Sequence, residues 1–454
     1  MELLRRSKRC RTALLTCLLS TLVLFLQLLV QLWLEWIEDA NVPVHHHITN
    51  KFSLNDVDDL VLVWWTPFTG NTGSFIECGN LKCFITEDRR FQHHSKFQMF
   101  LFYGSNLEIW DLPLPRKDQH IWSLFHEESP KNIPFLSHQE GISLFNFTAT
   151  FSRFSDVPLT LQYVQSFESL TDLQYYVPLS KKNELLQYLS PVLYVQSDCD
   201  TPLDRDKYVQ NLMRYISVDS YGTCLHNKDL PESMSNPMES MTSEEFLHFT
   251  AQYKFTIAFE NAVCEDYITE KLWRPLTVGS VPIYLGSPSV QDWLPSQNSA
   301  VLAINFSSPK ELASHISVLN SNDEEYLSLL SHKESVISNI YQKAKMNPRL
   351  WGSLKDNRYH FIDQFECQMC IKAHHNSKAN VQRKVANQEV YNCPKPISSV
   401  TGQEDPTNPW LYLWKYSKCE ASLLAEIIQG GHMFVNQTLF NQEVLSRMRE
   451  SDCT

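Results

Sequence analysis

The chain has 454 residues, of which 43% are hydrophobic and 20% are charged, and its formal net charge is −12. At ~100–200 residues per domain this length corresponds to two or three domains, and the composition excludes a mainly disordered or fibrous protein. The acidic balance excludes a broad surface for nucleic acid, because such surfaces need clustered lysine and arginine.

The N-terminal segment has the charge pattern of a membrane anchor. Five arginine and lysine residues lie before residue 12, and residues 13–34 carry no charged side chain. A helix needs ~20 apolar residues to cross a bilayer, whereas a cleavable signal peptide has a shorter apolar region. Basic residues mark the cytosolic end. We therefore predict a cytosolic tail (1–12), a signal-anchor helix (13–34) and a stem (35–57) of a type II membrane protein of the secretory pathway.

The cysteine residues agree with an oxidising lumen. Ten of them follow the anchor, at positions 78, 83, 199, 224, 264, 367, 370, 393, 419 and 453. An even number in this setting favours disulfides, and we take Cys78, Cys83, Cys367 and Cys370 as disulfide candidates. The spacing of Cys367 and Cys370 also occurs in redox and zinc motifs, but in the lumen a structural disulfide is the favoured interpretation.

Three sequons also fit this compartment. They predict N-linked glycans on Asn146, Asn305 and Asn436.

The pattern from residue 58 onward is that of an α/β protein. Residues 58–188 contain predicted strands at 60–65, 97–103 and 141–147, and residues 189–365 contain predicted strands at 192–195, 255–259 and 281–285. Helices are predicted at 206–215, at 266–277 and from Pro309, where Ser308 and Glu311 complete a helix-start signal. Alternating strands and helices indicate two Rossmann-like domains facing a cleft, followed by a cysteine-containing C-terminal extension at 366–454.

A helix start after the strand at 255–259 is a candidate phosphate site. Asp266 is the predicted N-cap, and Glu270 and Lys271 fall off the apolar stripe near the start of the helix. Ligands bind at the carboxyl ends of parallel strands, and a helix N-terminus attracts phosphate. On the pattern alone, an ordinary surface helix with a Glu-Lys pair is the favoured interpretation, because short motifs often occur by chance.

A second candidate segment follows the strand at 192–195. Asp198 and Asp200 have the spacing of a divalent-metal motif, although aspartates in such loops more often form turns. The planar guanidinium of Arg205 suits a pair of phosphate oxygens.

Two adjacent acids, Glu127 and Glu128, form a third candidate. A carboxylate within hydrogen-bond reach of a hydroxyl can act as a general base, but on the pattern alone a solvated loop before Pro130 is the favoured interpretation.

Several of these segments, in the same order, resemble the α-1,3-fucosyltransferase family. The resemblance rests on Phe259-Glu260-Asn261, on residues 266–271 and on Val281-Pro282. It also rests on Glu128-Ser129-Pro130, on Phe145 to Thr148 and on residues 218–222. The chain looks most similar to the divergent branch numbered ten and eleven of that family.

The resemblance implies a GT-B fold and transfer of L-fucose from GDP-β-L-fucose with inversion, without a metal or other cofactor. Glu128 becomes the catalytic base. The implied donor-binding residues are Arg205, Glu260, Asn261, Tyr267, Glu270 and Lys271, with Arg205 and Lys271 on the diphosphate. Glu127 is a second acid, which is either the base itself or a like charge that raises the pKa of Glu128.

The acceptor is not fixed by the resemblance, because the N-terminal half matches the family less well. One alternative is O3 of N-acetylglucosamine on N-glycans, and another is a serine or threonine hydroxyl of a folded protein. A third interpretation is a catalytically inactive GDP-fucose-binding or lectin-like protein, against which the joint presence of Glu128, Arg205 and Lys271 argues.

Overall fold

The computed structural model describes residues 52–164, 166–234, 240–241, 243–334, 359–376, 384–450 and 453. The predicted cytosolic tail, the predicted membrane anchor and residues 35–51 of the predicted stem lie outside this part of the chain. Among the residues that are described, no helix is both long enough and apolar enough to cross a membrane.

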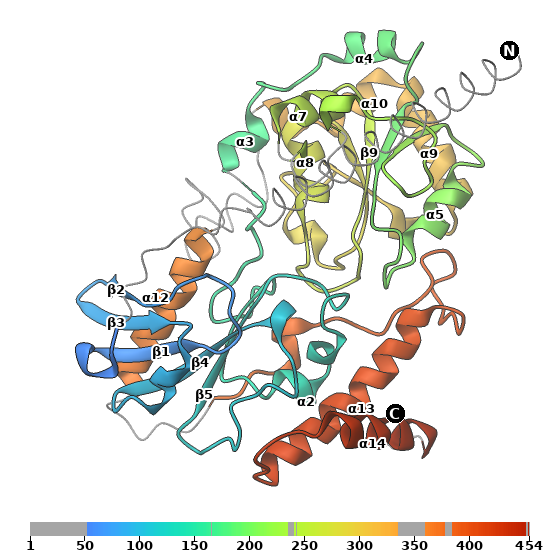
Figure 1. The fold of residues 1–454 in the computed structure, drawn as a ribbon. Coiled ribbons are helices and arrows are strands. Elements are labelled where there is room, and N and C mark those ends of the chain that lie inside the picture. Colours follow the sequence, from blue (N-terminus) through green and yellow to red (C-terminus); the bar gives the residue numbers. More distant parts are fainter. Residues whose placement is uncertain are drawn as a thin grey trace, which may run out of the picture. The chain divides into compact units, whose positions relative to one another are not determined.

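The first domain is built on a six-stranded sheet, counted over the described residues, in the order β2-β3-β1-β4-β5-β6 (Figure 1). The β2–β3 pair is antiparallel and the other pairs are parallel. Val61 to Trp64 are fully buried, which explains why the strand appears as a continuous apolar run. The strands are β1 (Leu60–Trp64), β2 (Ser74–Cys78), β3 (Leu81–Thr86), β4 (Phe97–Tyr103), β5 (Ile121–His126) and β6 (Phe147–Thr150).

The strand predicted at residues 141–147 is wrong. Gln139–Ile142 form the short helix α2, and β6 begins only at Phe147. Between them, Leu144 and Phe145 are buried in the core without joining the sheet, so the apolar run marks burial and not a strand. The strand β5, which leads to Glu127 and Glu128, was not predicted.

The second domain has a parallel sheet of five strands within the described residues, in the order β11-β10-β9-β7-β8. Its strands are β7 (Val192–Val195), β8 (Val218–Tyr221), β9 (Phe255–Phe259), β10 (Val281–Leu285) and β11 (Val301–Leu302). The prediction of two α/β blocks is confirmed. The helices of this region are α3 (Phe167–Thr171), α4 (Leu179–Leu185), α5 (Arg205–Leu212), α7 (Glu244–Ala251), α8 (Glu270–Val278), α9 (Pro309–Ser321) and α10 (Asp323–Ser328).

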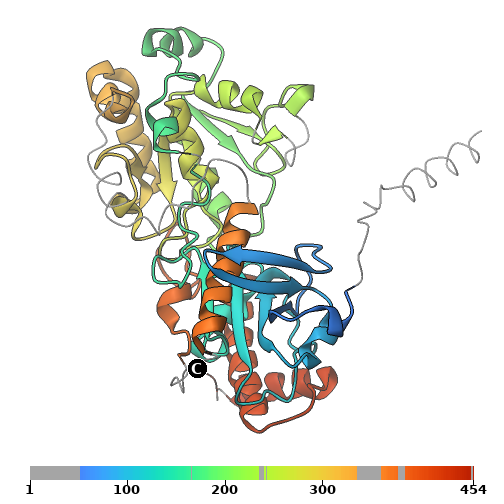
Figure 2. The same ribbon diagram turned by 90° about the vertical axis from the view of Figure 1, so that its left-hand side faces the viewer.

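The chain then returns to the first domain. Helix α12 (Tyr359–Asn376) lies along β1, β2 and β3, as the orange helix beside the blue strands in Figures 1 and 2. Two disulfides hold it there, Cys78–Cys367 and Cys83–Cys370. Residues 359–365, which we assigned to the donor domain, therefore pack with the first sheet.

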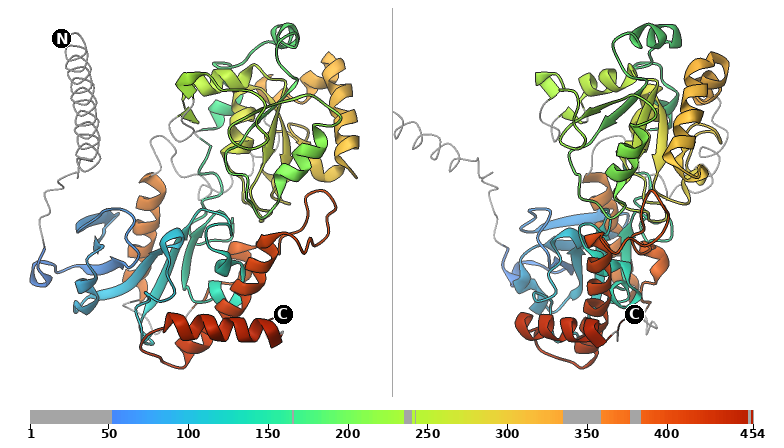
Figure 3. Two further views of the ribbon diagram at one scale, coloured as in Figure 1. Left: turned by 45° about the vertical axis from the view of Figure 1, so that its right-hand side comes forward. Right: turned by 90° about the vertical axis from the view of Figure 1, so that its right-hand side faces the viewer.

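The last part of the chain forms a strap and two helices. Residues 384–397, which we call the strap, lead to α13 (Pro409–Gln429) and α14 (Gln437–Glu450), which pack against each other (Figure 3). Helix α13 also contacts α2 of the first domain. The disulfide Cys264–Cys393 joins the strap to the loop after β9.

Candidate active site

The acids at the carboxyl end of β5 are held from two sides. Tyr103 Oη donates a hydrogen bond of 3.2 Å to Glu127 Oε1, and Tyr391 Oη donates one of 2.8 Å to the main-chain oxygen of Glu128. Both glutamates are half-buried. Tyr391 belongs to the strap, so the C-terminal extension helps to fix the backbone at Glu128.

His126, the last residue of β5, is fully buried beneath these acids. A Cβ atom on Gly104 would lie 2.5 Å from its ring, so glycine is required there for the ring to fit. The centroid of the His126 ring lies 5.6 Å from the centroid of the Tyr391 ring. Burial lowers the pKa of His126 to about 3, and the neutral ring therefore acts as a packing support for the acidic segment.

At the carboxyl end of β9, Glu260 is tied to the start of α8. It is fully buried and accepts hydrogen bonds of 2.8 Å from both the main-chain nitrogen and Oγ1 of Thr269. Thr269 is the N-cap of α8, so the prediction that Asp266 caps this helix is wrong. Burial raises the pKa of the Glu260 carboxyl to about 7, although Lys271 opposes this shift.

The first turn of α8 concentrates charge. Lys271 Nζ lies 3.2 Å from Glu270 Oε1 and 3.9 Å from Glu260 Oε2. Burial opposes ionisation of Glu270, but Lys271 and Arg274 outweigh it and lower its pKa to about 2. Lys271 and Arg274 line a pocket of about 20 Å³ together with Val195, the last residue of β7, and Gln196. The pocket has room for about one water molecule.

Asp266 has a different role from the one predicted. Its carboxylate is fully buried and forms an ion pair of 2.6 Å with Arg153, which follows β6 in the first domain. Ser289 Oγ and Trp293 Nε1 donate to the same carboxylate, at 2.7 and 2.8 Å. Burial opposes ionisation, but the hydrogen bonds from Arg153 outweigh it and lower the pKa of Asp266. This cluster ties the β9–α8 loop to the first domain.

Acids from both domains influence the pKa of two buried tyrosines. Burial raises the pKa of Tyr163, and the next largest contributions come from Glu128 and Glu270. For Tyr267, burial is again the main cause, followed by Glu128 and Glu260. Both phenols are therefore influenced by Glu128 of the first domain and by glutamates of the second. The ion pairs Lys131–Asp198 and Arg153–Asp266 join the same two domains directly, so the predicted base and the predicted donor-binding acids lie on segments that are in contact.

Arg205 lies in this region but is turned toward the backbone. It is buried, and its guanidinium donates to the main-chain oxygens of Phe259 and Asp198, at 3.0 and 2.8 Å. Its Nε has no partner within the described residues, and the same is true of Asn261 Oδ1 and Arg274 Nη2. Buried polar atoms without partners mark positions where water or a ligand binds.

The aspartates of the alternative metal motif have protein partners. Asp198 forms an ion pair with Lys131, which follows the Glu-Ser-Pro segment, and Asp200 Oδ1 accepts a hydrogen bond of 2.6 Å from Trp410 Nε1. The two carboxylates are thus held by different elements.

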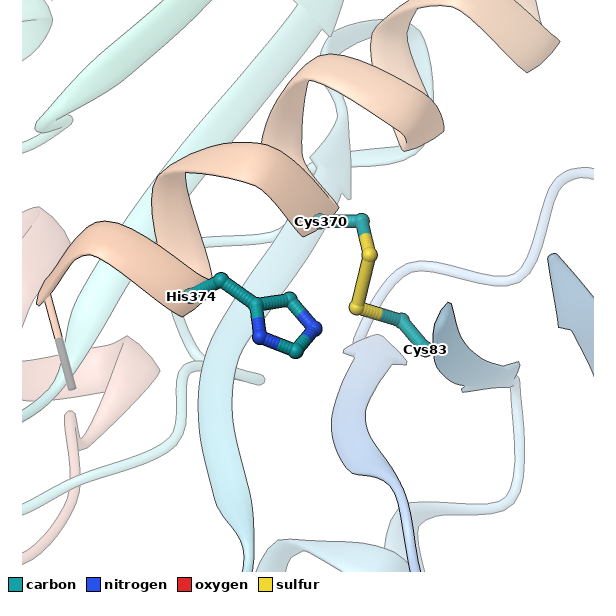
Figure 4. A group of neighbouring side chains, drawn as sticks. All are labelled: Cys83, Cys370 and His374. Carbon is teal, nitrogen blue, oxygen red and sulfur yellow. A yellow bond between two sulfur atoms is a disulfide. The ribbon is translucent and has the colours of Figure 1, made fainter. Parts of the chain in front are cut away.

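All ten cysteines after the predicted anchor form disulfides, five in number within the described chain, so the prediction of disulfide bonding is confirmed. Cys367 and Cys370 pair with β2 and β3 and not with each other. Figure 4 shows His374 beside Cys83–Cys370. Because both sulfurs are consumed in the disulfide, this group does not fit a zinc site.

The three sequons differ in exposure. Asn305 and Asn436 are exposed. Asn146 is buried, its Oδ1 accepts from Trp122 N at 2.9 Å, and its Nδ2 donates to Lys384 O at 2.9 Å. A glycan on this Nδ2 is incompatible with the folded arrangement, which corrects the prediction for Asn146.

Sequence reasoning missed Tyr163, Arg274 and Tyr391 as neighbours of the site. Arg274 carries a local signal, because it lies one helical turn after Glu270. Tyr163 and Tyr391 are placed by long-range packing and carry none.

Comparisons with known proteins identify the family. The family model described as fucosyltransferase, N-terminal, matches residues 57–163. The model described as glycosyltransferase family 10 (fucosyltransferase), C-terminal, matches residues 179–388. The chain belongs to glycosyltransferase family 10, the fucosyltransferases. The predicted family and the prediction of an enzyme of the fucosyltransferase class are confirmed.

This fucosyltransferase has curated relatives over most of its length. It is 47% identical over 388 residues to the Gallus gallus protein named GDP-fucose protein O-fucosyltransferase 3, covering 83% of this chain and 82% of that protein. It is 47% identical over 389 residues to the Homo sapiens protein of that name, covering 83% and 81%. A crystal structure of alpha1,3-fucosyltransferase is 18% identical, with a TM-score of 0.39, and covers 68% of this chain and 94% of the other.

Proposed function

We propose that the chain transfers L-fucose from GDP-β-L-fucose, with inversion, to a serine or threonine hydroxyl of a protein acceptor. The carrying observation is that ion pairs join the two domains beside the predicted site residues: Lys131, three residues after Glu128, pairs with Asp198, and Arg153 pairs with Asp266 just before α8. Family membership supports fucosyl transfer. The name of the relatives supports a protein acceptor in preference to a glycan.

The proposed donor site lies at the start of α8. Departing GDP accumulates negative charge on its phosphates, and Lys271, Arg274 and the helix N-terminus supply positive potential. Asn261 Oδ1 and Arg205 Nε, which lack partners in the described part of the chain, supply further polar contacts. The pocket beside Lys271 has room for about one water molecule, so it is the size of a single polar group of the donor and not of the whole nucleotide.

Glu128 is the proposed base. It takes the proton of the attacking hydroxyl while that oxygen bonds to C1 of fucose and GDP leaves from the opposite face. Among the charges that raise the pKa of Tyr163, Glu128 has a larger effect than Glu127, and Glu128 has the largest effect of any charge on the pKa of Tyr267. We therefore assign Glu127 the role of a neighbouring charge, held by Tyr103.

We propose that transfer needs no divalent metal. Asp198 forms an ion pair with Lys131, and Asp200 accepts a hydrogen bond from Trp410, so both carboxylates already have protein partners. The cationic side chains at the start of α8 supply the positive charge that a metal ion would supply to a diphosphate.

We further propose residence in the lumen of the Golgi or endoplasmic reticulum, as a type II protein anchored by residues 13–34. The five disulfides of the described chain support an oxidising compartment. The exposed sequons at Asn305 and Asn436 agree with it.

The test is transfer of tagged fucose from GDP-fucose to a mixture of secretory proteins by the purified full-length chain. Products are treated with an amidase that removes N-glycans, and tagged peptides are mapped. Label on serine or threonine supports the proposal. Label on glycans contradicts the protein acceptor, and absence of label with GDP binding intact contradicts the enzyme activity.

A further inference from the structure

A mostly apolar cavity of about 200 Å³ lies beside the proposed active site. It is formed by segments that are far apart in the sequence. Pro130 contributes to its wall two residues after Glu128, and Ala262 contributes directly after Asn261. The cavity wall thus includes residues that neighbour both the proposed base and a proposed donor-binding residue in the sequence.

The remaining wall comes from the C-terminal extension. Residues 393–397 of the strap and Trp410 and Trp414 of α13 line the cavity. The matches to the family models end at residue 388, so these residues lie outside the matched segments. The wall is rigid, because five prolines line it and the disulfide Cys264–Cys393 crosses it.

We infer that this cavity binds an apolar side chain of the protein acceptor, next to the residue that receives fucose. This inference rests on the proposed function. A preformed pocket of prolines and tryptophans buries an apolar side chain at low entropic cost.

The nucleobase of the donor is the competing occupant. Guanine carries hydrogen-bonding groups along its edge, and burying them without partners is unfavourable. The lining of the cavity is dominated by proline, tryptophan and aliphatic side chains, which offer few such partners. An apolar amino-acid side chain is therefore the better match.

The test places a charge in the cavity wall. Ile397 lines the cavity and is 38% exposed, so Ile397→Asp is compatible with folding. Leu413→Asp is the matched control, because Leu413 is 39% exposed on α13 and does not line the cavity. For each variant of the full-length chain, we would measure GDP binding, hydrolysis of GDP-fucose without acceptor, and transfer of tagged fucose to secretory proteins.

We expect Ile397→Asp to reduce transfer by about tenfold or more, as is typical of a disrupted apolar substrate pocket. GDP binding and donor hydrolysis should stay at the parent level, and Leu413→Asp should match the parent in all three. Parent-level transfer by Ile397→Asp overturns the inference. Loss of GDP binding at an unchanged melting temperature also overturns it, because the cavity would then hold the nucleotide.

A binding measurement tests whether the cavity binds an apolar side chain even if the parent chain transfers no fucose. Saturation-transfer NMR would use N-acetyl-phenylalanine amide as the apolar probe and N-acetyl-asparagine amide as the polar control. We expect a signal only for the apolar probe, lost in Ile397→Asp and retained in Leu413→Asp. Equal signals from both probes, or a signal that survives Ile397→Asp, overturn the inference. If Ile397→Asp does not fold, Ile397→Ser replaces it.

Discussion

Tyr391 and Glu128 are 263 residues apart in the sequence, yet the phenol of one donates a hydrogen bond of 2.8 Å to the main-chain oxygen of the other. The strap that carries Tyr391 is also linked to the loop after β9 through Cys264–Cys393. One segment of the C-terminal extension therefore contacts the proposed base and is bonded to the donor side of the site.

Tyr391→Phe should test whether this contact positions the base. The variant loses one hydrogen bond worth about 0.5–1.5 kcal/mol, so we expect kcat to fall between about twofold and tenfold. KM for GDP-fucose should not change, because the contact is on the side of the base. Tyr412→Phe, at an exposed tyrosine of the same extension, should leave both constants unchanged. A change in KM for GDP-fucose without a change in kcat would contradict a role of Tyr391 in positioning the base.

Glu128→Gln should separate donor binding from transfer. The amide preserves the shape of the side chain but cannot take a proton, so we expect transfer to fall by about 10²–10⁴-fold. GDP affinity, measured by calorimetry, should remain that of the parent. The matched variant is Glu127→Gln, which we expect to retain most of the activity. Full activity in Glu128→Gln would remove Glu128 from the mechanism, and an inactive Glu127→Gln would transfer the role to Glu127.

The strands that could be predicted are those buried on both faces. The strands β7 and β10 are continuous runs without a polar side chain other than a tyrosine hydroxyl, so their existence and limits follow from the sequence pattern. The start of α9 could also be predicted, because Ser308 Oγ accepts from Glu311 N at 3.3 Å within one turn. These signals are local, and local patterns are what a single sequence carries.

The geometry of the site depends on contacts between distant residues. Asp266 is a residue type that often caps helices, but its carboxylate accepts hydrogen bonds from Arg153, which lies 113 residues earlier. Thr269 caps the helix instead. In β5, the buried polar residues Ser123 and His126 interrupt the apolar run that would have indicated a strand. Arg205 has the fork expected of a phosphate ligand, yet two of its nitrogens bond to main-chain oxygens that no sequence pattern reveals.

Lys271→Ala should weaken donor binding. Lys271 is the charged donor closest to the start of α8, and a hydrogen bond to a charged group contributes about 1.5–3 kcal/mol, which corresponds to roughly 10–150-fold in the dissociation constant of GDP. Lys310 occupies the equivalent second position of α9 and is exposed, so Lys310→Ala is the matched control without an expected effect. Equal GDP affinity in Lys271→Ala and the parent would exclude Lys271 from the diphosphate site.

Chelation should leave the reaction intact. With its cationic side chains on α8 and with Asp198 and Asp200 held by Lys131 and Trp410, the chain should transfer fucose in excess EDTA at the rate seen with added Mn²⁺. The comparison is made by release of GDP under both conditions. Strict dependence on Mn²⁺ would restore these two aspartates as metal ligands.

Glu366→Gln should make the protein more stable at neutral and alkaline pH. Glu366 on α12 is buried, and burial raises its pKa to about 7, although Trp64 Nε1 donates a hydrogen bond of 2.8 Å to its Oε1. The folded state therefore binds this proton more tightly than the unfolded state, whose pKa is near the ordinary value of 4.5. The resulting contribution to stability is fully present below pH ~4.5 and is lost as the pH rises through ~7.

The glutamine keeps an acceptor for Trp64 and never ionises. The gain over the parent in unfolding free energy should therefore grow from near zero at pH 4.5 to on the order of 3 kcal/mol above pH 7. Denaturant melts of both proteins across this range measure the difference. Glu77→Gln, at an exposed position on β2, should show no such pH-dependent gain. A gain that is the same at every pH would mean that packing, and not the buried charge, limits stability at this site.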